Sequence, residues 1–366
     1  MVSRLIVIIW SIGLIEMKII ESFLLLLSAH ILVACASTGE MGPKVRSYTL
    51  DSFKVSSLSV SNADRYETDS LVMAAPGHIK FWKDSILVVT DLLYRNGQVT
   101  MIDLRTKGFQ RFVPRGRGPN ELLSVFDISD QDGNLWLASL QDKSIMRVVK
   151  ADSIELSKYQ MKDGFLKVSP WKDDLILALS AGFSGNRLDI RRYSGETIDT
   201  VGSFPILKDS PDIVPANALF QSDICASPDF KHVVVVCKSF EYIDVYDDDF
   251  HLVTRLSGPE RCRESAKIVE TSAGSRRYVQ TPAYNIHHEV VSDNQQFMVG
   301  YIGRLVDSEE AADAMINTIL SFSWSGKPLN AYKFDVEILS FDMDWDTERL
   351  YCLVKDEKPY IVSWKL

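Results

Sequence analysis

The sequence is poor in the residues and motifs that most readily mark a chemical function. Its 366 residues include 5 cysteines and 6 histidines, and they contain neither a P-loop nor a dinucleotide-binding fingerprint. After Cys35, the remaining cysteines have no CxxC spacing and no histidines placed for zinc, so neither a metal nor a cofactor is expected. An oxidising compartment would permit a bridge between Cys225 and Cys237, but two buried thiols are the favoured interpretation.

Positive charge is also in short supply. The 49 Asp and Glu residues outnumber the 40 Lys and Arg residues and give a formal net charge of -9. A negative overall field repels polyanions, so we expect no nucleic-acid partner.

Long apolar runs are confined to the N-terminus. The stretch "MKIIESFLLLLSAHILVAC" has a lysine-bearing start, an apolar centre and small residues before Cys35, as an export signal does. Its end, "LVAC", resembles the lipobox of bacterial lipoproteins, which implies cleavage before Cys35 and a lipid on that residue. We therefore predict a signal peptide over residues 1–34, a lipid-anchored linker over 35–45 and an extracytoplasmic domain over 46–366. Placement on the periplasmic side or on the outer surface stays open.

An uncleaved membrane anchor is the alternative, because a second apolar run, "LIVIIWSIGLI", lies upstream. Glu16, Lys18 and Glu21 interrupt the two runs. Neither run reaches the roughly 18–20 apolar residues of a spanning helix. Met17 is then the expected start, and residues 1–16 an extension that does not belong to the protein.

Segments with helical periodicity are nearly absent after the linker. Short runs rich in Val, Ile, Leu and aromatic residues alternate with tight polar turns, which predicts an all-β domain. The order of the runs repeats about every 50 residues, which is typical of propeller blades. Five units of four runs each cover residues 77–113, 122–160, 165–203, 218–258 and 284–334.

The last unit, residues 336–366, supplies only three strands. Residues 45–55, "VRSYTLDSFKV", read as a further strand and can fill the empty place. Closure matters because an open ring would leave unpaired strand edges. We predict a six-bladed β-propeller of four-stranded blades in which the N-terminal strand closes the last blade.

Loop lengths separate the two faces of this propeller. Short connections join the first strand to the second and the third to the fourth, as at residues 130–134 and 194–196, and define the tight-turn face. The long connections, residues 205–218, 258–283 and 304–316, belong to the opposite, long-loop face. The last of them begins with Asp307 and Ser308 as candidate N-caps, which predicts a short helix. Long loops on a rigid scaffold usually carry the binding function.

The stretch "RGRGPNEL", residues 115–122, lies on the long-loop face between the first two blades. Its glycines allow close approach of the chain, and Pro119 stiffens the entry to the next strand. A weaker copy, "SGPE" at residues 257–260, occupies the equivalent position after the fourth blade. The repetition favours a structural role over a ligand contact.

The lipobox, the sixfold pattern and above all "GRGPNEL" resemble the TolB-like six-bladed β-propeller lipoproteins of Bacteroides-type bacteria. The resemblance covers nearly the whole mature chain. It implies the fold and a location in the cell envelope, and it carries no settled activity.

Our leading functional hypothesis is a non-catalytic binding or scaffold module that holds a protein, peptide or glycan through the long-loop face. Several arginines fall in its loops, and their forked guanidinium groups suit carboxylates, sulfates and aromatic faces. The candidate binding residues are Arg115, Arg117, Asn120, Glu121, Arg276, Arg277 and Arg304. The alternative reading is a solvated rim of paired charges.

An enzyme is the rival hypothesis: a hydrolase or lyase that acts on a carbohydrate or lactone in the central channel, by analogy with other six-bladed propellers. In "NIHHE" adjacent strand residues point to opposite faces, so His287 and His288 are not expected to share a metal ion. The same alternation puts Glu289 on the side of His287. The candidate catalytic residues are His78, Asp127, Asp223, His287 and Asp342.

Overall fold

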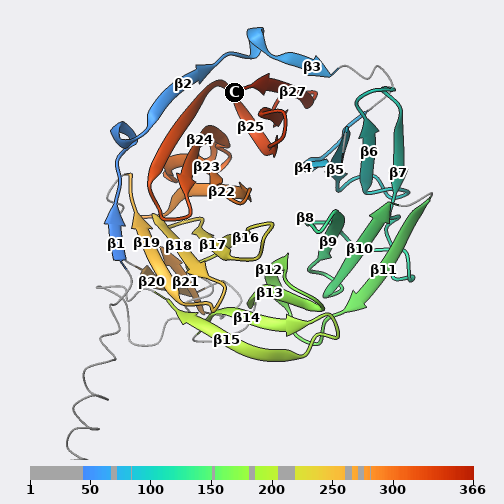
Figure 1. The fold of residues 1–366 in the computed structure, drawn as a ribbon, viewed down its shortest axis with the longest axis horizontal. Helices are drawn as coiled ribbons and strands as arrows, with labels where there is room; N and C mark the ends of the chain where they lie inside the picture. The colour runs from blue at the N-terminus through green and yellow to red at the C-terminus, as the bar shows by residue number, and fades with distance from the viewer. Residues whose placement is uncertain are drawn as a thin grey trace, which may run out of the picture. The chain divides into compact units, whose positions relative to one another are not determined.

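The computed structural model describes residues 44–66, 72–83, 85–150, 153–180, 186–204, 219–259, 266–270, 276–280 and 282–366. The chain divides into two compact units, Met1–Lys44 and Val45–Leu366. The predicted signal peptide and the lipidation residue Cys35 lie outside the described residues. In the second unit the strands form blades around a central axis (Figure 1).

The first three blades are antiparallel sheets of four consecutive strands, with the first strand of each at the axis. They comprise β4 (Pro76–Trp82), β5 (Ile86–Asp91), β6 (Val99–Asp103) and β7 (Phe109–Phe112); β8 (Asp127–Gln131), β9 (Asn134–Ser139), β10 (Ser144–Lys150) and β11 (Ile154–Gln160); and β12 (Phe165–Pro170), β13 (Leu175–Ser180), β14 (Asn186–Arg192) and β15 (Thr197–Ser203).

The other three blades follow the same plan, but blades five and six are joined by one long strand. β25 (Pro328–Asp344) pairs with β24 through its first part and with β26 from Ile338 onward, so it ends blade five and begins blade six. Blades four to six comprise β16 (Ser222–Ala226), β17 (His232–Cys237), β18 (Tyr242–Asp247) and β19 (Leu252–Ser257); β22 (Tyr284–Ser292), β23 (Gln296–Leu305), β24 (Ile316–Ser323) and β25; and β25, β26 (Arg349–Val354), β27 (Tyr360–Lys365) and β3 (Asp64–Tyr66).

The N-terminal segment runs along the outside of these last three blades (Figure 1). β1 (Lys44–Ser47) adds to β19 of blade four, and β2 (Lys54–Leu58) pairs in parallel with β25 of blade five. β3 then pairs antiparallel with β27 and completes blade six. The prediction that an N-terminal strand closes the last blade is confirmed.

The predicted closing segment, residues 45–55, was wrong. Tyr48 and Phe53 are buried and make edge-to-face contacts with Phe322 at centroid distances of 5.2 Å each. This aromatic cluster lies between blades four and five, and burial of three rings outweighs any pairing the segment could make farther on. The shorter and more polar β3 therefore closes the ring.

The core consists of apolar layers between neighbouring blades. Within the described part of the chain, one buried cluster lies between each pair of adjacent blades. At the closing seam, Ile79 and Leu87 of blade one pack against Leu353 and Ile361 of blade six. The ring is thus closed by side-chain packing as well as by strand pairing.

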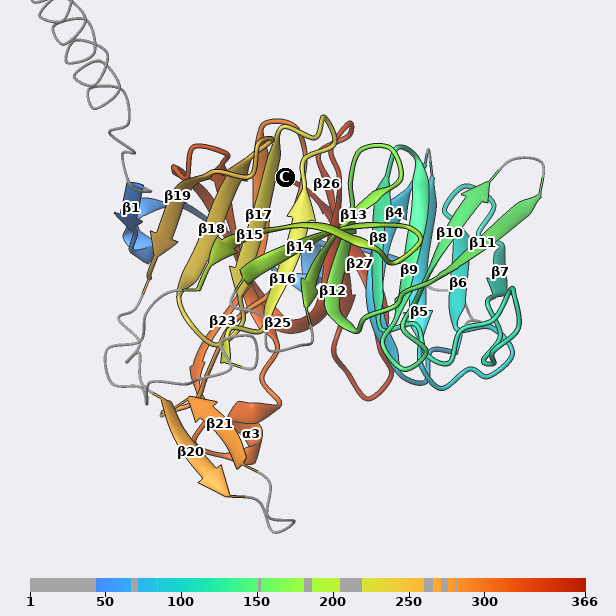
Figure 2. The same ribbon diagram turned by 90° about the horizontal axis from the view of Figure 1, so that it is seen from below.

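The long-loop face carries two additional elements, which project from it in Figure 2. The short helix α3 (Glu309–Ala312) confirms the helix predicted there. Residues 258–283, expected as a plain loop, contain a hairpin of β20 (Ala266–Glu270) and β21 (Arg276–Gln280). Its strands hold the β-branched and aromatic residues of "KIVE" and "RRYV", a signal that was available in the sequence.

Two further expectations concern cysteines and membrane spans. Cys225, Cys237 and Cys352 are free thiols, as favoured from the sequence. No helix among the described residues has the length and apolarity needed to cross a bilayer.

We expect removal of the N-terminal wrap to open the ring. A chain that starts at residue 67 loses β1, β2 and β3, and so leaves the edge of β27 unpaired. It should show no cooperative thermal unfolding and should aggregate on concentration. A chain that starts at Lys44 is the control and should melt like the full mature protein. Cooperative melting of the shorter chain at the control's temperature would contradict the assigned closure.

Candidate functional site

Charged side chains line the axis of the ring, where the first strands of the blades meet. Each inner strand starts at the long-loop face and ends at the tight-turn face, so a residue's position in its strand gives its depth in the channel. Buried charges are costly unless they are paired, and nearly all of these have partners. The charged residues concerned are His78, Lys80, Asp127, Asp130, Lys167, Asp223, Lys238, His288, Glu289 and Asp342.

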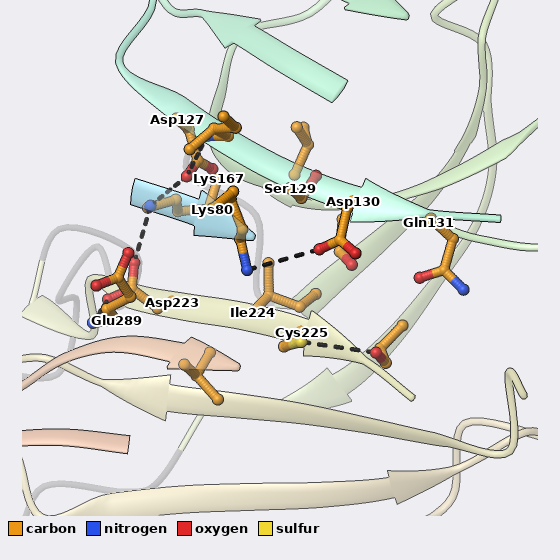
Figure 3. A pocket seen from close by; sticks show the side chains of 15 residues that line it. Lys80, Asp127, Ser129, Asp130, Gln131, Lys167, Asp223, Ile224, Cys225 and Glu289 are labelled. Carbon is orange, nitrogen blue, oxygen red and sulfur yellow. Dashed lines mark hydrogen bonds and ion pairs between the residues drawn. The ribbon is translucent and has the colours of Figure 1, made fainter. Parts of the chain in front are cut away.

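The half of the channel nearer the long-loop face is occupied by an ion network, and Figure 3 shows its central part, where Lys167 contacts Asp127 and Asp223. The Lys167 ammonium lies 2.7 Å from the Asp127 carboxylate and 3.1 Å from that of Asp223. Asp223 is also 3.3 Å from Lys238 and 3.7 Å from the His288 ring. Four blades, the second to the fifth, are therefore tied together across the axis by these contacts.

Glu289 joins this network from β22. Its carboxylate accepts hydrogen bonds from the Ser340 hydroxyl at 2.7 Å and the Phe341 backbone N–H at 2.8 Å. The His78 Nδ1 atom lies 3.2 Å away. The Glu289 backbone N–H in turn donates to Asp223 at 2.9 Å. Every described contact of the carboxylate thus satisfies its negative charge.

The predicted facing of "NIHHE" was wrong. The register of β22 shifts between His288 and Val290, and Glu289 has a positive φ of 65°, so simple alternation is broken. His288 and Glu289 both reach the network. His287 instead packs outside the channel, where it contacts the Cys237 carbonyl at 2.9 Å and the Tyr48 hydroxyl at 3.4 Å. Burial lowers the pKa of His287 to about 4, so it is neutral at physiological pH.

The network fixes the protonation states of its members. Burial alone would raise the pKa of Asp223, but Lys167, Lys238 and His288 outweigh it and hold that pKa well below its usual range. Burial is likewise outweighed at Lys167, whose pKa Asp127 and Asp223 raise. Hydrogen bonds and charge from His78 lower the pKa of Glu289 against burial. These groups are held ionised and paired, which is unfavourable for proton transfer.

The half nearer the tight-turn face differs in both charge and space. Lys80 lies 3.3 Å from Asp342 and 3.7 Å from Asp130, and it has no second lysine beside it in the described lining. A cavity of about 280 Å³ opens here. Burial, together with the Asp130 carboxylate, raises the pKa of Asp342 to about 7 against the opposing effect of Lys80. Burial raises the pKa of the Cys225 thiol to about 11, so Cys225 is not a thiolate nucleophile.

The structure brings four of the five candidate catalytic residues into the channel. His78, Asp127 and Asp223 lie in the network, Asp342 lies beside the cavity, and His287 lies outside. The sequence reasoning missed the basic partners Lys80, Lys167 and Lys238. Lys80 stands two residues after His78 on the same inner strand, and this period of two could have revealed it. No metal-binding cluster occurs among the described residues.

The "RGRGPNEL" stretch makes mostly internal contacts. The Glu121 carboxylate accepts the Gly118 backbone N–H at 2.8 Å, and a Cβ added at Gly116 would stand 1.9 Å from that carboxylate. Lys158 of β11 donates to the Glu121 carbonyl at 2.8 Å. A larger residue at position 116 would displace the Glu121 carboxylate from its place over the turn. These contacts explain the motif as the seam between blades one and two.

The other candidate binding residues lie farther apart. Arg115 donates to the Leu92 carbonyl at 2.8 Å, and its side chain is otherwise exposed. Arg117 and Asn120 are exposed in the same turn, and Arg304 is exposed on β23. Arg276 and Arg277 lie on β21 of the projecting hairpin. Arg115 and Arg117 thus share one turn, while Arg304 and the strand that carries Arg276 and Arg277 belong to other elements.

We expect Lys167→Met to destabilise the fold by about 3–5 kcal/mol at neutral pH, because it leaves Asp127 and Asp223 buried with too little positive charge. Urea unfolding measures this change. Pairing lowers the pKa of Asp223 in the folded state. The free energy that this carboxylate contributes to the wild type is therefore complete above its unfolded-state pKa, and it is lost as the pH falls from there through its folded-state pKa. The gap between variant and wild type should therefore shrink in acid.

Lys172→Met is the matched control for this variant. Lys172 is 43% exposed, and its ion pair with Asp248 spans 3.8 Å at the surface. It should change stability by less than about 1 kcal/mol. Equal effects of the two substitutions would show that the channel network does not stabilise the ring.

Comparison with known proteins bears on the fold and the family. The family described as "TolB-like 6-blade propeller-like" matches residues 55–346, well over half of the chain. A comparison with curated proteins finds no match.

Three solved structures illustrate the similarity in fold. A Bacteroides fragilis protein named as an expected exported protein is 10% identical, with a TM-score of 0.53 over 87% of this chain and 98% of that one. A DUF4221 family member from Bacteroides vulgatus is 10% identical, with a TM-score of 0.51 over 81% and 93%. A streptogramin B lyase is 11% identical, with a TM-score of 0.47 over 82% and 96%, a level that does not bear on activity.

The family match runs from β2 to the end of β25, and its six-bladed architecture agrees with the six blades around the axis, of which blades five and six share one sheet through β25. The resemblance inferred from the lipobox, the repeats and "GRGPNEL" is thereby confirmed at the level of the family. On these grounds the chain is a member of the TolB-like six-bladed propeller family.

Proposed function

We propose that the mature chain is a non-catalytic binding module of the cell envelope, anchored through a lipid on Cys35, whose long-loop face holds a protein or peptide partner. The observation that carries the proposal is the projecting hairpin of β20 and β21. In the described part of the chain these two strands pair only with each other, so each keeps one unpaired edge.

Such edges suit the addition of an extended segment from a partner. Unpaired backbone N–H and C=O groups form a template for another strand, and two strands alone are marginally stable in water. The base of the hairpin is fixed to the ring, because the Gln280 side chain donates to the Ser239 carbonyl at 2.6 Å and accepts from the Tyr284 backbone at 3.1 Å. A third strand from a partner would extend a sheet that the ring already positions.

The state of the channel supports binding over catalysis at this face. Asp127, Asp223 and Glu289 are the acids closest to the long loops, and all three are engaged in ion pairs or hydrogen bonds. A general acid or base needs a pKa near the working pH and a free side on which to meet the substrate. The lowered pKa of Asp223 and of Glu289 moves both away from that condition.

A hydrolase or lyase remains the second candidate. Four of the five proposed catalytic residues do converge on the axis, and Asp342 has a pKa of about 7. Catalysis would therefore have to take place beside Asp342, at the tight-turn end. Assays of lactones and glycosides with the wild type and with Asp342→Asn separate the two candidates. Turnover by the wild type that Asp342→Asn loses would favour the enzyme, and no turnover by the wild type would favour the binding module.

The envelope location rests on the N-terminal residues and on the family. The lipobox-like "LVAC" ends an export-type segment, and one structural relative is named for its expected export.

Site-specific photocrosslinking tests the proposed partner face. A photoreactive amino acid at exposed Lys267 or Glu270 of the hairpin should give a discrete crosslinked species in intact cells. The same probe at Asp248, which is 52% exposed in a short turn between β18 and β19, is the control and should give none. Replacing residues 266–280 by a short Gly-Ser linker should abolish the species while the ring still folds. Crosslinks that form equally at Asp248 would refute the long-loop face as the binding face.

Lipid anchoring has its own test. Cys35→Ser removes the only thiol that the lipobox-like sequence offers for acylation. We expect the wild type in the membrane fraction and the variant either released or retained as an uncleaved precursor with no incorporated labelled fatty acid. Cys225→Ser, a change within the ring, should leave labelling intact. Labelling of Cys35→Ser at the wild-type level would rule out the anchor.

A further inference from the structure

The tight-turn end of the channel contains a cavity that the proposed partner face does not use. It has a volume of about 280 Å³ and is lined by residues from the ends of β4, β8, β16, β22 and β25. Its walls combine charged groups with the apolar side chains of Phe81, Met343 and Trp345. A concave site with an apolar wall and a few convergent polar groups is the usual form of a small-molecule site.

The charges in this cavity are not balanced as they are elsewhere in the channel. In the network, Asp127 contacts Lys167, Asp223 contacts both Lys167 and Lys238, and Glu289 contacts His78. In the cavity, Asp130 and Asp342 share Lys80 alone. Asp132 adds a third carboxylate to the lining. Lys80 is therefore the single basic residue among the described lining residues, against three acidic ones, at the place where the side chains leave room.

Asp342 is the buried carboxylate of this cavity. Its Oδ2 atom accepts the Phe81 backbone N–H at 2.7 Å, and its Oδ1 atom lies 3.3 Å from the Lys80 ammonium. The charged groups that face it are Lys80 on β4 and Asp130 on β8, with Cys225 on β16 and Glu289 on β22 also close to Lys80. The Lys83 ammonium lies 5.3 Å from the Trp82 ring centroid and close to Gly133, but Lys83 is not itself one of the residues that line the cavity. Burial, and after it the Asp130 carboxylate, raise the pKa of Asp342 to about 7 against the opposing effect of Lys80.

We infer that this cavity binds a small organic ammonium ion, whose charge completes the set formed by Asp130, Lys80 and Asp342 and whose apolar body packs against Trp345 and Phe81. The ammonium would occupy the position that a second lysine has in the network. An aromatic wall suits the apolar body of such a ligand because contact with it removes apolar surface from water. An anion would have to approach two or three carboxylates across a single lysine, and a neutral molecule would leave the imbalance in place. This inference does not depend on the partner proposed for the long-loop face.

Calorimetric titration of the full mature chain with benzylamine tests the inference, with benzyl alcohol and benzoate as probes of the same shape. We expect benzylammonium to bind at least about tenfold more tightly than the alcohol, and benzoate not to bind. Binding should be about tenfold tighter at pH 8 than at pH 6, because the ligand favours ionised Asp342 and its pKa is about 7 in the empty site. A proton should be released on binding near pH 7.

Asp130→Asn is the test variant, since this side chain is 46% exposed and its substitution keeps the shape of the lining. It should weaken benzylammonium binding about tenfold without lowering the melting temperature. Asp248→Asn makes the same charge change outside the cavity and should bind like the wild type. The inference is overturned if benzylamine does not bind, if the three probes bind equally, if benzoate binds best, or if Asp130→Asn binds as the wild type does.

Discussion

The pairing of β3 with β27 is the constraint on which the rest of the structure depends. Three residues, Asp64–Tyr66, occupy the outer edge of blade six and join the two ends of the domain. The strand is short, but the Trp364 indole also donates to the Ser59 carbonyl at 3.0 Å, and Tyr66 contacts Ser363 at 3.1 Å. Because a ring has no free blade, every inner strand is held at a fixed distance from the axis. Only then can side chains from different blades meet in the channel.

The charges on the axis follow from that geometry. Six inner strands bring their side chains to one line, and burial there makes any unmatched charge expensive. Near the long loops the chain supplies both signs, and the result is a rigid cross-link between blades. Near the tight turns it supplies too few bases and leaves space. The same channel is thus structural at one end and receptive at the other, and the difference lies in the number of lysines.

The repeat pattern was sufficient to predict the blades, because apolar runs separated by tight turns mark strands directly. Which N-terminal residues close the ring was not predictable, since both 45–55 and 64–66 can form strands and only the burial of Tyr48 and Phe53 decides between them. His287 was misplaced for a similar reason. A β-bulge at Glu289 inverts the facing of its neighbours, and nothing in "NIHHE" marks it. Asp127 and Asp223 could be found as acids on inner strands, whereas their pairing with Lys167 depends on contacts between blades.

The outer path of the N-terminal segment has a mechanical consequence. Tension on the residues before Lys44 would enter the ring at β1, on blade four, and not at the closing strand. To reach β3 the force would first have to peel away β1, extract Tyr48 and Phe53 from their cluster, and shear β2 from β25, with which it runs parallel. Shear loads all the hydrogen bonds of a strand together, whereas peeling breaks them one by one. A tethered copy of this domain would therefore resist pulling first at blade five, through the pairing of β2 with β25. The pairing of β3 with β27 would bear force only afterwards.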